Sequence, residues 1–300
     1  MNTRWLLNLV LLILVSVLVL LAVYEPGKKV PIVRPITPLI ISDIDRISIK
    51  RGDSDIQFRK QATHWIITSP VKTVASQLRI NGLLGLAGAH SFASFEVAPE
   101  DLKKYAIGKG QITFNDTSIS FGDVEEVNKR RYVYVNNKVH LIVDSYYHQL
   151  ITDSTSFVSS RLLPPDSKIA SLGLKPVKQP YLKLQRTADD RWRVLPDSVL
   201  ASAEQLNQLI NTWQTSTALY VSKASAAPSA GTIDISLVSG ETLAFQIIKT
   251  EADEFILRRP DIKVDYHMLA ETRKQLLQLP ALENDPAQGS TDSSRDAANK

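Results

Sequence analysis

The first long hydrophobic segment of the chain runs from Trp5 to Tyr24 and carries no charged residue. Apart from the aromatic residues at its ends, only Asn8 and Ser16 are polar. About twenty helical residues span roughly 30 Å, which is the thickness of the hydrocarbon core of a bilayer. Because a helix satisfies its own backbone hydrogen bonds in lipid, the pattern predicts a transmembrane anchor over residues 1–24.

Two other interpretations of this segment stay open. The hydrophobic region of a cleaved signal peptide is usually about 7–15 residues long and ends in a small-x-small cleavage site. Here the run is longer, and Ala22 is the only small residue near its end. A buried core helix of a soluble protein is the remaining alternative. We therefore expect an uncleaved single-pass anchor.

The charges around the segment give conflicting indications of its orientation. Arg4 precedes it, while Lys28, Lys29 and Arg34 follow it. Counted alone, these residues place the C-terminal side in the cytoplasm, but long following domains are translocated largely regardless of charge. The short N-terminal tail is typical of a signal anchor whose N-terminus stays inside. We expect the C-terminal part of the chain to be exported.

Two segments lack the pattern of a folded element. Residues 25–42 carry Pro26, Pro31, Pro35 and Pro38. Because proline fixes φ and removes a backbone donor, an extended, stiff spacer is predicted there. At about 3.1 Å per residue its first fourteen residues would reach up to about 40 Å. Residues 283–300 are rich in Asp, Ser, Asn and Ala with few large apolar side chains, which predicts a disordered tail.

Residues 43–172 are predicted to form a first α+β unit. Ile47 and Ile49 alternate with polar neighbours, the pattern of a half-buried strand. A helix is expected over 74–89, although its glycines weaken the prediction. The apolar residues expected on its buried face are Leu78, Leu83, Leu84 and Leu86. The other expected strands are 56–59, 64–68, 111–115, 117–121, 131–135 and 140–144, with a short helix at 101–108.

The same order of patterns returns in residues 177–282. Residues 196–210 align without gaps on residues 70–84, with identical Pro, Ala, Ser and Asn about 125 positions apart. Residues 181–186 echo 47–51, and 192–195 echo 65–68. A loop is expected over 223–231. The strands expected in this second unit are 181–186, 192–195, 233–237, 243–248, 254–258 and 263–266.

Together these patterns predict the α+β fold class. The expected architecture is two tandem repeats, each an antiparallel meander sheet with a packed helix, behind a single N-terminal transmembrane helix. Repeated units usually pack against each other and bury what each leaves exposed.

Composition narrows the possible partners. Of the 300 residues, 44% are hydrophobic and 22% are charged, and the net charge is +4. Acidic and basic residues are interspersed, without the dense basic face that nucleic-acid binding requires, so we expect no nucleic-acid partner. The chain has no cysteine, which removes disulfides and thiol chemistry.

The sequence offers few candidates for chemistry. The five histidines have no H-E-x-x-H spacing, so structural histidines are favoured over metal ligands. Ser69 and Lys72 fit S-x-x-K, but Pro70 lies between them and the companion S-D-N and K-T-G motifs are absent. The Gly108-Lys109-Gly110 segment lacks the other residues of a P-loop.

Acidic and aromatic residues add two further alternatives. The acidic pairs with a cation-like spacing are Asp43 with Asp45 and Asp53 with Asp55, which we interpret as solvated turn residues. Trp65 and Trp192 could stack on a ligand, but core packing is the simpler interpretation. We therefore predict no catalytic, cofactor-binding or metal-binding residue and no cofactor.

The segment HWIITSPVKTVASQLRINGLL, at residues 64–84, carries a family resemblance. It is followed by DLKKYAIG, SISFGD, RRYVYVNN and VHLIVD behind one hydrophobic helix. Over residues 44–280 this resembles the bacterial family called domain of unknown function 4340. Members look like anchored envelope proteins, and some are similar to proteins encoded beside ABC-transporter subunits of the gliding-motility kind. The shared motifs are core residues, and no catalytic residues come with them.

The resemblance implies an accessory role at a membrane complex. We expect a non-enzymatic accessory or scaffold subunit in the bacterial inner membrane, single-pass, with its C-terminal domain in the periplasm. Its expected partners are inner-membrane lipid and membrane proteins, possibly those of an ABC transporter. The alternative is a periplasmic module that presents a polysaccharide, lipid or peptide to a transporter. That function would need a pocket between the repeats lined by Tyr132, Tyr134, Tyr146 and Tyr147.

Overall fold

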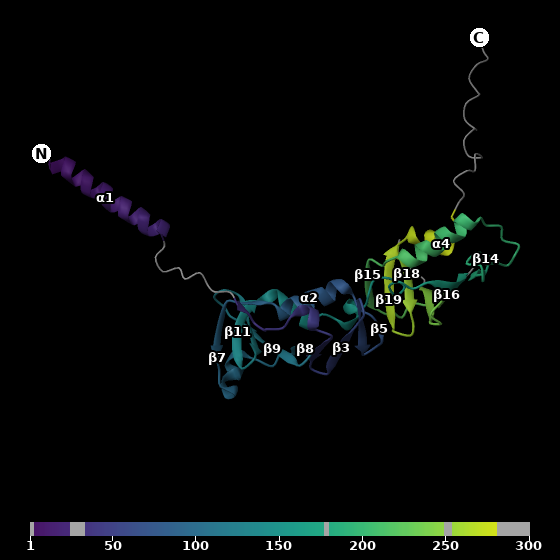
Figure 1. Ribbon diagram of the computed structural model, residues 1–300, viewed down its shortest axis with the longest axis horizontal. Coiled ribbons are helices and arrows are strands. Elements are labelled where there is room, and N and C mark those ends of the chain that lie inside the picture. Colours follow the sequence, from purple (N-terminus) through teal and green to yellow (C-terminus); the bar gives the residue numbers. More distant parts are fainter. Residues whose placement is uncertain (1–2, 25–33, 177–179, 249–253, 281–300) are drawn as a thin grey trace, which may run out of the picture.

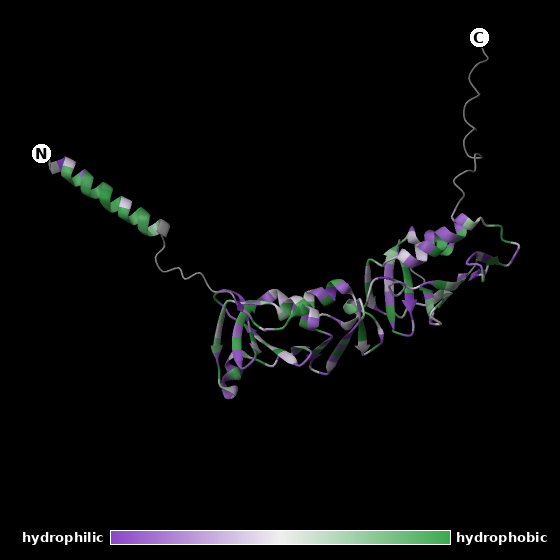
Figure 2. Ribbon diagram, in the orientation of Figure 1, coloured by the Kyte–Doolittle hydropathy of each residue, from purple (hydrophilic) through white to green (hydrophobic). Residues whose placement is uncertain are grey.

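The computed structural model describes residues 3–24, 34–176, 180–248 and 254–280 (Figure 1). The first of these ranges is helix α1 (Thr3–Tyr24). Its side chains are exposed from Arg4 to Ala22, and Figure 2 shows hydrophobic residues around the whole helix. It is long and apolar enough to span a membrane, and a signal sequence would pass the same test. The structure thus confirms a helix that could span a membrane at the place predicted from the sequence.

The first part of the body is a nine-stranded antiparallel sheet with the order β5-β4-β3-β2-β8-β9-β10-β11-β7. Helix α2 (Gln77–Ala87) covers one of its faces (Figure 1). The strands are β2 (Arg46–Arg51), β3 (Ser54–Gln61), β4 (His64–Ser69), β5 (Thr73–Val74), β7 (Ala93–Glu96), β8 (Gln111–Phe114), β9 (Thr117–Val124), β10 (Arg130–Val135) and β11 (Lys138–Val143).

Short elements close this first part. The end of the predicted spacer does not stand free, because β1 (Arg34–Pro35) pairs with β6 (His90–Ser91) and the Thr37 hydroxyl donates to the Ala87 carbonyl at 2.6 Å. The rest of the spacer, residues 25–33, lies outside the described residues. The short helices are α3 (Tyr147–Ile151) and the 3₁₀ segments η1 (Ile41–Asp43), η2 (Pro99–Tyr105), η3 (Asp144–Tyr146) and η4 (Ser154–Phe157).

The second part is an eight-stranded antiparallel sheet with the order β14-β13-β12-β16-β17-β18-β19-β15. Helices α4 (Ala203–Thr215) and α5 (Thr272–Leu277) accompany it. The strands are β12 (Ile169–Pro176), β13 (Leu182–Arg186), β14 (Trp192–Leu195), β15 (Tyr220–Lys223), β16 (Ser229–Leu237), β17 (Thr242–Ile248), β18 (Glu254–Arg259) and β19 (Val264–Leu269). The predicted disordered tail at 283–300 lies outside the described residues.

The chain is therefore α+β, with the expected antiparallel sheets. The strands form where apolar and polar residues alternate along the chain. In β2 the apolar residues Ile47 and Ile49 are buried, and their register partners in β8 are Phe114 and Ile112. Helix α4 begins with a capping box, in which Ser202 and Gln205 each bind the other's backbone N–H. Its buried residues Leu206, Leu209, Ile210 and Trp213 form one face.

Some predicted details differ from the structure. Leu78 is 81% exposed, because α2 buries the face of Ile80, Leu83 and Leu86, and Leu78 lies about half a turn away from that face. Leu84 is half-buried. The short helix predicted at 101–108 is the 3₁₀ segment η2. The loop predicted at 223–231 is shorter, because β15 ends at Lys223 and β16 begins at Ser229.

One connecting segment, residues 157–162, joins the two sheets by hydrogen bonds on both of its sides. Toward the first sheet, the Ser76 N–H donates to the Phe157 carbonyl at 2.7 Å and the Ser159 N–H donates to the Val74 carbonyl at 2.9 Å. Toward the second sheet, the Ala218 N–H donates to the Ser160 carbonyl at 2.8 Å and the Leu162 N–H to the Ser216 carbonyl at 3.3 Å. The buried apolar residues of both sheets belong to one contiguous core.

Candidate functional site

The residues singled out for chemistry from the sequence do not form one site. The Ser69 hydroxyl donates to the Asp55 carbonyl at 3.4 Å at the end of β4. Helix α2 begins only at Gln77, so Ser69 is not at the helix start that serine–lysine chemistry needs. Asp43 lies in η1 and Asp45 is exposed. Among the described residues, no three His, Asp or Glu side chains lie close enough to hold a metal ion.

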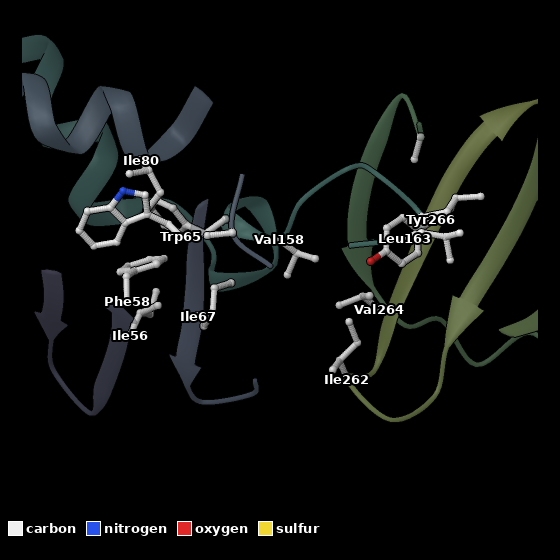
Figure 3. Close-up of a cluster of buried hydrophobic side chains, with 14 of the residues drawn as sticks. Ile56, Phe58, Trp65, Ile67, Ile80, Val158, Leu163, Ile262, Val264 and Tyr266 are labelled. Atoms are coloured by element: carbon white, nitrogen blue, oxygen red, sulfur yellow. The ribbon is translucent and has the colours of Figure 1, made fainter. Parts of the chain in front are cut away.

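The two tryptophans differ in their surroundings. Trp65 is 3% exposed and lies in the core of the first sheet, as the packing interpretation predicts (Figure 3). Trp192 is half-buried on the edge strand β14, with the guanidinium of Arg186 over its ring at 5.8 Å. Neither ring lines a described cavity.

A Ser–His–Glu cluster lies across three neighbouring strands of the second sheet. Ser222 comes from β15, His267 from β19 and Glu254 from β18. The Ser222 Oγ is 2.8 Å from the Nε2 of His267, and the Nδ1 of His267 is 2.9 Å from the Oε1 of Glu254. With the proton on Nδ1, the Nε2 of the imidazole accepts a hydrogen bond from the Ser222 hydroxyl. This is the connectivity of a nucleophile, a base and an orienting carboxylate.

The surroundings of this cluster favour a structural role. The Tyr220 ring stacks on His267 with centroids 4.2 Å apart, and its hydroxyl donates to the same Glu254 oxygen at 3.2 Å. Ser222 lies opposite Asp265 in the ladder of β15 and β19. The ladder continues regularly, because the Ala224 N–H donates to the Lys263 carbonyl. The four side chains therefore fasten the edge strand β15 to its neighbours.

We expect a fluorophosphonate probe to leave Ser222 unmodified. Attack by a serine needs backbone donors for the oxyanion, and loss of one such donor costs roughly 10²–10³ in rate. The backbone at Ser222 is instead part of a regular ladder. In intact-mass analysis after probe treatment, neither the wild-type chain nor Ser222→Ala should gain the mass of the probe adduct. Stoichiometric labelling that disappears in Ser222→Ala and in His267→Gln would show a working nucleophile.

A pocket lies at the junction of the two sheets. Its volume is about 360 Å³, within the range of small-ligand sites. The first sheet contributes polar residues such as His64 and Lys72, the connecting segment contributes Arg161, and the second sheet contributes Arg259 and Tyr266. Three basic residues and one acidic residue, Glu241, line it.

The lining of this pocket differs from the sequence hypothesis. None of the four tyrosines expected there, Tyr132, Tyr134, Tyr146 and Tyr147, contributes to it. Tyr132 instead packs on Tyr105, with ring centroids 5.0 Å apart, and the ring of Tyr147 lies under the guanidinium of Arg131 at 3.6 Å. The pocket between the sheets exists, but basic and polar residues dominate its wall in place of an aromatic lining.

Comparisons with protein-family models, with curated proteins and with solved structures found no match to this chain. The resemblance to the family called domain of unknown function 4340 stays a prediction.

Proposed function

We propose that this protein is a single-pass, membrane-anchored accessory subunit that acts without catalysis in a membrane protein complex. In this proposal α1 lies in the bacterial inner membrane and the two-sheet body lies in the periplasm, where it holds partner subunits such as those of an ABC transporter. The observation that carries the proposal is the exposed apolar surface of α1. Exposing this uncharged surface, from Trp5 to Ala22, to water is unfavourable, whereas the hydrocarbon core of a bilayer accommodates it.

The body supplies a suitable scaffold under this proposal. The connecting segment fixes the two sheets to each other, and β7 offers an edge strand whose residues Ala93–Glu96 are all exposed. Such an edge presents backbone donors and acceptors to another chain. Phe95 on this strand, together with Tyr105 and Tyr132, gives the edge an aromatic cluster. A partner could therefore add a strand or pack an apolar side chain here.

We also propose that the two parts of the body are internal copies. Support comes from the strand orders β4-β3-β2-β8-β9-β10-β11-β7 and β14-β13-β12-β16-β17-β18-β19-β15, which correspond one to one once the two-residue edge strand β5 of the first sheet is set aside. Helix α2 follows β4 and the short β5 along the chain, and helix α4 follows β14, so the two helices take equivalent positions. In this correspondence β13, at residues 182–186, matches β3, and β12 matches β2. The sequence comparison instead pairs residues 181–186 with 47–51 in β2, so it is shifted by one strand.

The anchor is tested by a pair of matched variants. Leu12→Arg with Val15→Arg should move the protein from the carbonate-washed membrane fraction to the soluble or degraded fraction. Each arginine at the centre of a helix costs roughly 2.5–3.5 kcal/mol on insertion scales. Leu12→Ala with Val15→Ala should stay in the membrane. A soluble wild-type chain whose N-terminal sequence begins after Ala22 would instead establish a cleaved signal.

The scaffold role is tested on the wild-type and alanine forms in mild detergent. Native mass spectrometry should show a stoichiometric complex with an integral membrane protein. The same preparation of a Phe95→Glu variant should lose that partner if the β7 edge carries the contact. A wild-type chain that runs only as a free monomer, with no membrane partner, would contradict the proposal.

A further inference from the structure

The pocket between the sheets is lined by a mostly buried tyrosine, Tyr266. Tyr266 is 2% exposed, and its hydroxyl makes no hydrogen bond among the described residues. It is not one of the fully enclosed unpaired polar atoms, so its oxygen opens into the pocket that the residue lines. The ring is held in the core by Phe245, at a centroid distance of 6.2 Å. Figure 3 shows its oxygen pointing away from its own sheet, toward Val158 and the first sheet. A hydroxyl that opens into a pocket and has no partner in the protein is free to donate to a bound ligand.

Burial also determines the state of this hydroxyl. It raises the pKa of Tyr266 to about 12. The phenol therefore keeps its proton at neutral pH and acts as a donor. A neutral donor stabilises an anion and does not repel it.

Arg259 supplies the fixed positive charge of the same wall. It is 8% exposed, and its Nε and Nη2 donate to the two carboxylate oxygens of Asp261 at 2.8 and 2.6 Å. This bidentate pair holds the guanidinium plane in place. Its remaining nitrogen, Nη1, has no hydrogen-bond partner among the described residues. Arg259 therefore has one donor group left while its position is set by Asp261.

Two exposed basic side chains approach from the other sides. Lys72 comes from the turn before β5, and Arg161 comes from the connecting segment, where one of its nitrogens donates to the Gln214 carbonyl at 3.3 Å. Together with Arg259 they give the lining three positive charges against the single carboxylate of Glu241. The nearby Asp261 neutralises one of the three, which leaves a surplus of one positive charge.

We propose that this pocket binds the oxyanion of a small ligand, a phosphate or carboxylate group, between the Tyr266 hydroxyl, the Arg259 guanidinium and the flexible side chains of Lys72 and Arg161. Hydrogen bonds from charged groups and buried hydroxyls to an oxyanion are the strong ones in proteins. Because these residues come from both sheets and from the connecting segment, the ligand contacts all three. This inference goes beyond the scaffold role and does not depend on it.

The test uses the full chain in a nonionic detergent. Isothermal titration with sodium phosphate and, separately, with sodium acetate is run at constant ionic strength against sodium chloride. Tyr266→Phe removes only the hydroxyl and keeps the packed ring, so it should fold. Since a hydrogen bond to a charged group is a strong one, Tyr266→Phe should weaken binding by at least about tenfold. Lys72→Gln, at an exposed position, should weaken binding by roughly two- to fivefold.

The matched control is Arg193→Gln, which removes an exposed positive charge paired with Asp197 outside this pocket. It should bind like the wild type. Binding of phosphate, of acetate or of both, lowered by Tyr266→Phe and Lys72→Gln but not by Arg193→Gln, supports the inference and identifies which oxyanion is preferred. Binding of neither anion above the chloride reference, or equal binding by Tyr266→Phe, overturns it. Neither failure alters membrane anchoring or partner recovery, which are measured separately.

Discussion

Replacing Trp213 with alanine is expected to lower the free energy of unfolding by about 3–5 kcal/mol. Trp213 lies on α4, is fully buried and packs its ring 5.9 Å from that of Phe245. Its indole Nε1 also donates to the Leu276 carbonyl at 2.9 Å, which ties α4 to α5. The truncation removes one of the largest fully buried side chains and leaves that carbonyl without its donor.

Urea unfolding of the full chain in detergent, followed by far-ultraviolet circular dichroism, measures this effect. Trp213→Phe should lose distinctly less than Trp213→Ala, because it keeps an aromatic ring in the same space. Leu200→Ala is the control, since Leu200 is 93% exposed and should change stability by less than about 0.5 kcal/mol. A Trp213→Ala protein with wild-type stability would mean that α4 does not cover the core as described.

The second large effect is expected at Asp265. Its side chain is 1% exposed and accepts two hydrogen bonds from Arg258, at 2.7 and 3.0 Å, and one from the Ser225 N–H at 2.8 Å. Asp265→Ala leaves a mostly buried guanidinium and a backbone N–H without their partner. Breaking such a pair from one side costs about 3–5 kcal/mol. The same urea titration measures the loss.

The pH dependence of this pair gives an independent check. Burial alone would raise the pKa of Asp265, but the hydrogen bond from Arg258, with those from Ser225, lowers it below its ordinary value of 3.8. A carboxylate with a lowered folded pKa contributes stability above its unfolded pKa, and this contribution is lost as the pH falls through the folded pKa. We therefore expect the wild type to lose stability below about pH 4, and Asp265→Asn to show a flatter curve there.

Asp190→Ala serves as the matched control for both measurements. Its carboxylate pairs with Arg186 at 2.9 Å but is 75% exposed, so its loss should cost less than about 1 kcal/mol. If Asp190→Ala and Asp265→Ala proved equally destabilising, the buried pair would not have the role assigned to it.

The periodic strands could be predicted from the sequence because each alternates sharply between the core and solvent. Ile47 and Ile49 illustrate this pattern in β2. The strands that sequence reasoning missed lack the alternation. All four residues of β7 are exposed, and the centre of β12 is buried on both faces at Leu172, Gly173 and Leu174. Tertiary pairing, and not local pattern, makes these segments strands.

Helix α2 shows a second limit of sequence reasoning. Gly82 weakens a helix prediction because glycine costs conformational entropy. In the fold, a Cβ at this position would lie 2.7 Å from the Nε2 of Gln149, so the glycine leaves room for the end of that side chain from α3. The reason for this residue lies 67 positions away along the chain and is not contained in the local pattern.

The candidate sites were harder to foresee than the fold. Ser222, Glu254 and His267 form no spaced motif, and only the pairing of β18, β19 and β15 brings them together. Arg259 and Tyr266 meet Lys72 only because the connecting segment sets the second sheet beside the first. No signal in the sequence singles out these two residues, because the segment between Arg259 and Tyr266 is as charged as the rest of the surface, with Asp261, Lys263 and Asp265.

The connecting segment between the sheets has a mechanical consequence. Its four backbone hydrogen bonds, two to the first part of the body and two to the second, must break before the halves can swing apart as on a hinge. A pull applied through the membrane helix would thus pass through these bonds as shear into the second part, and the body would tilt as one lever instead of bending in its middle.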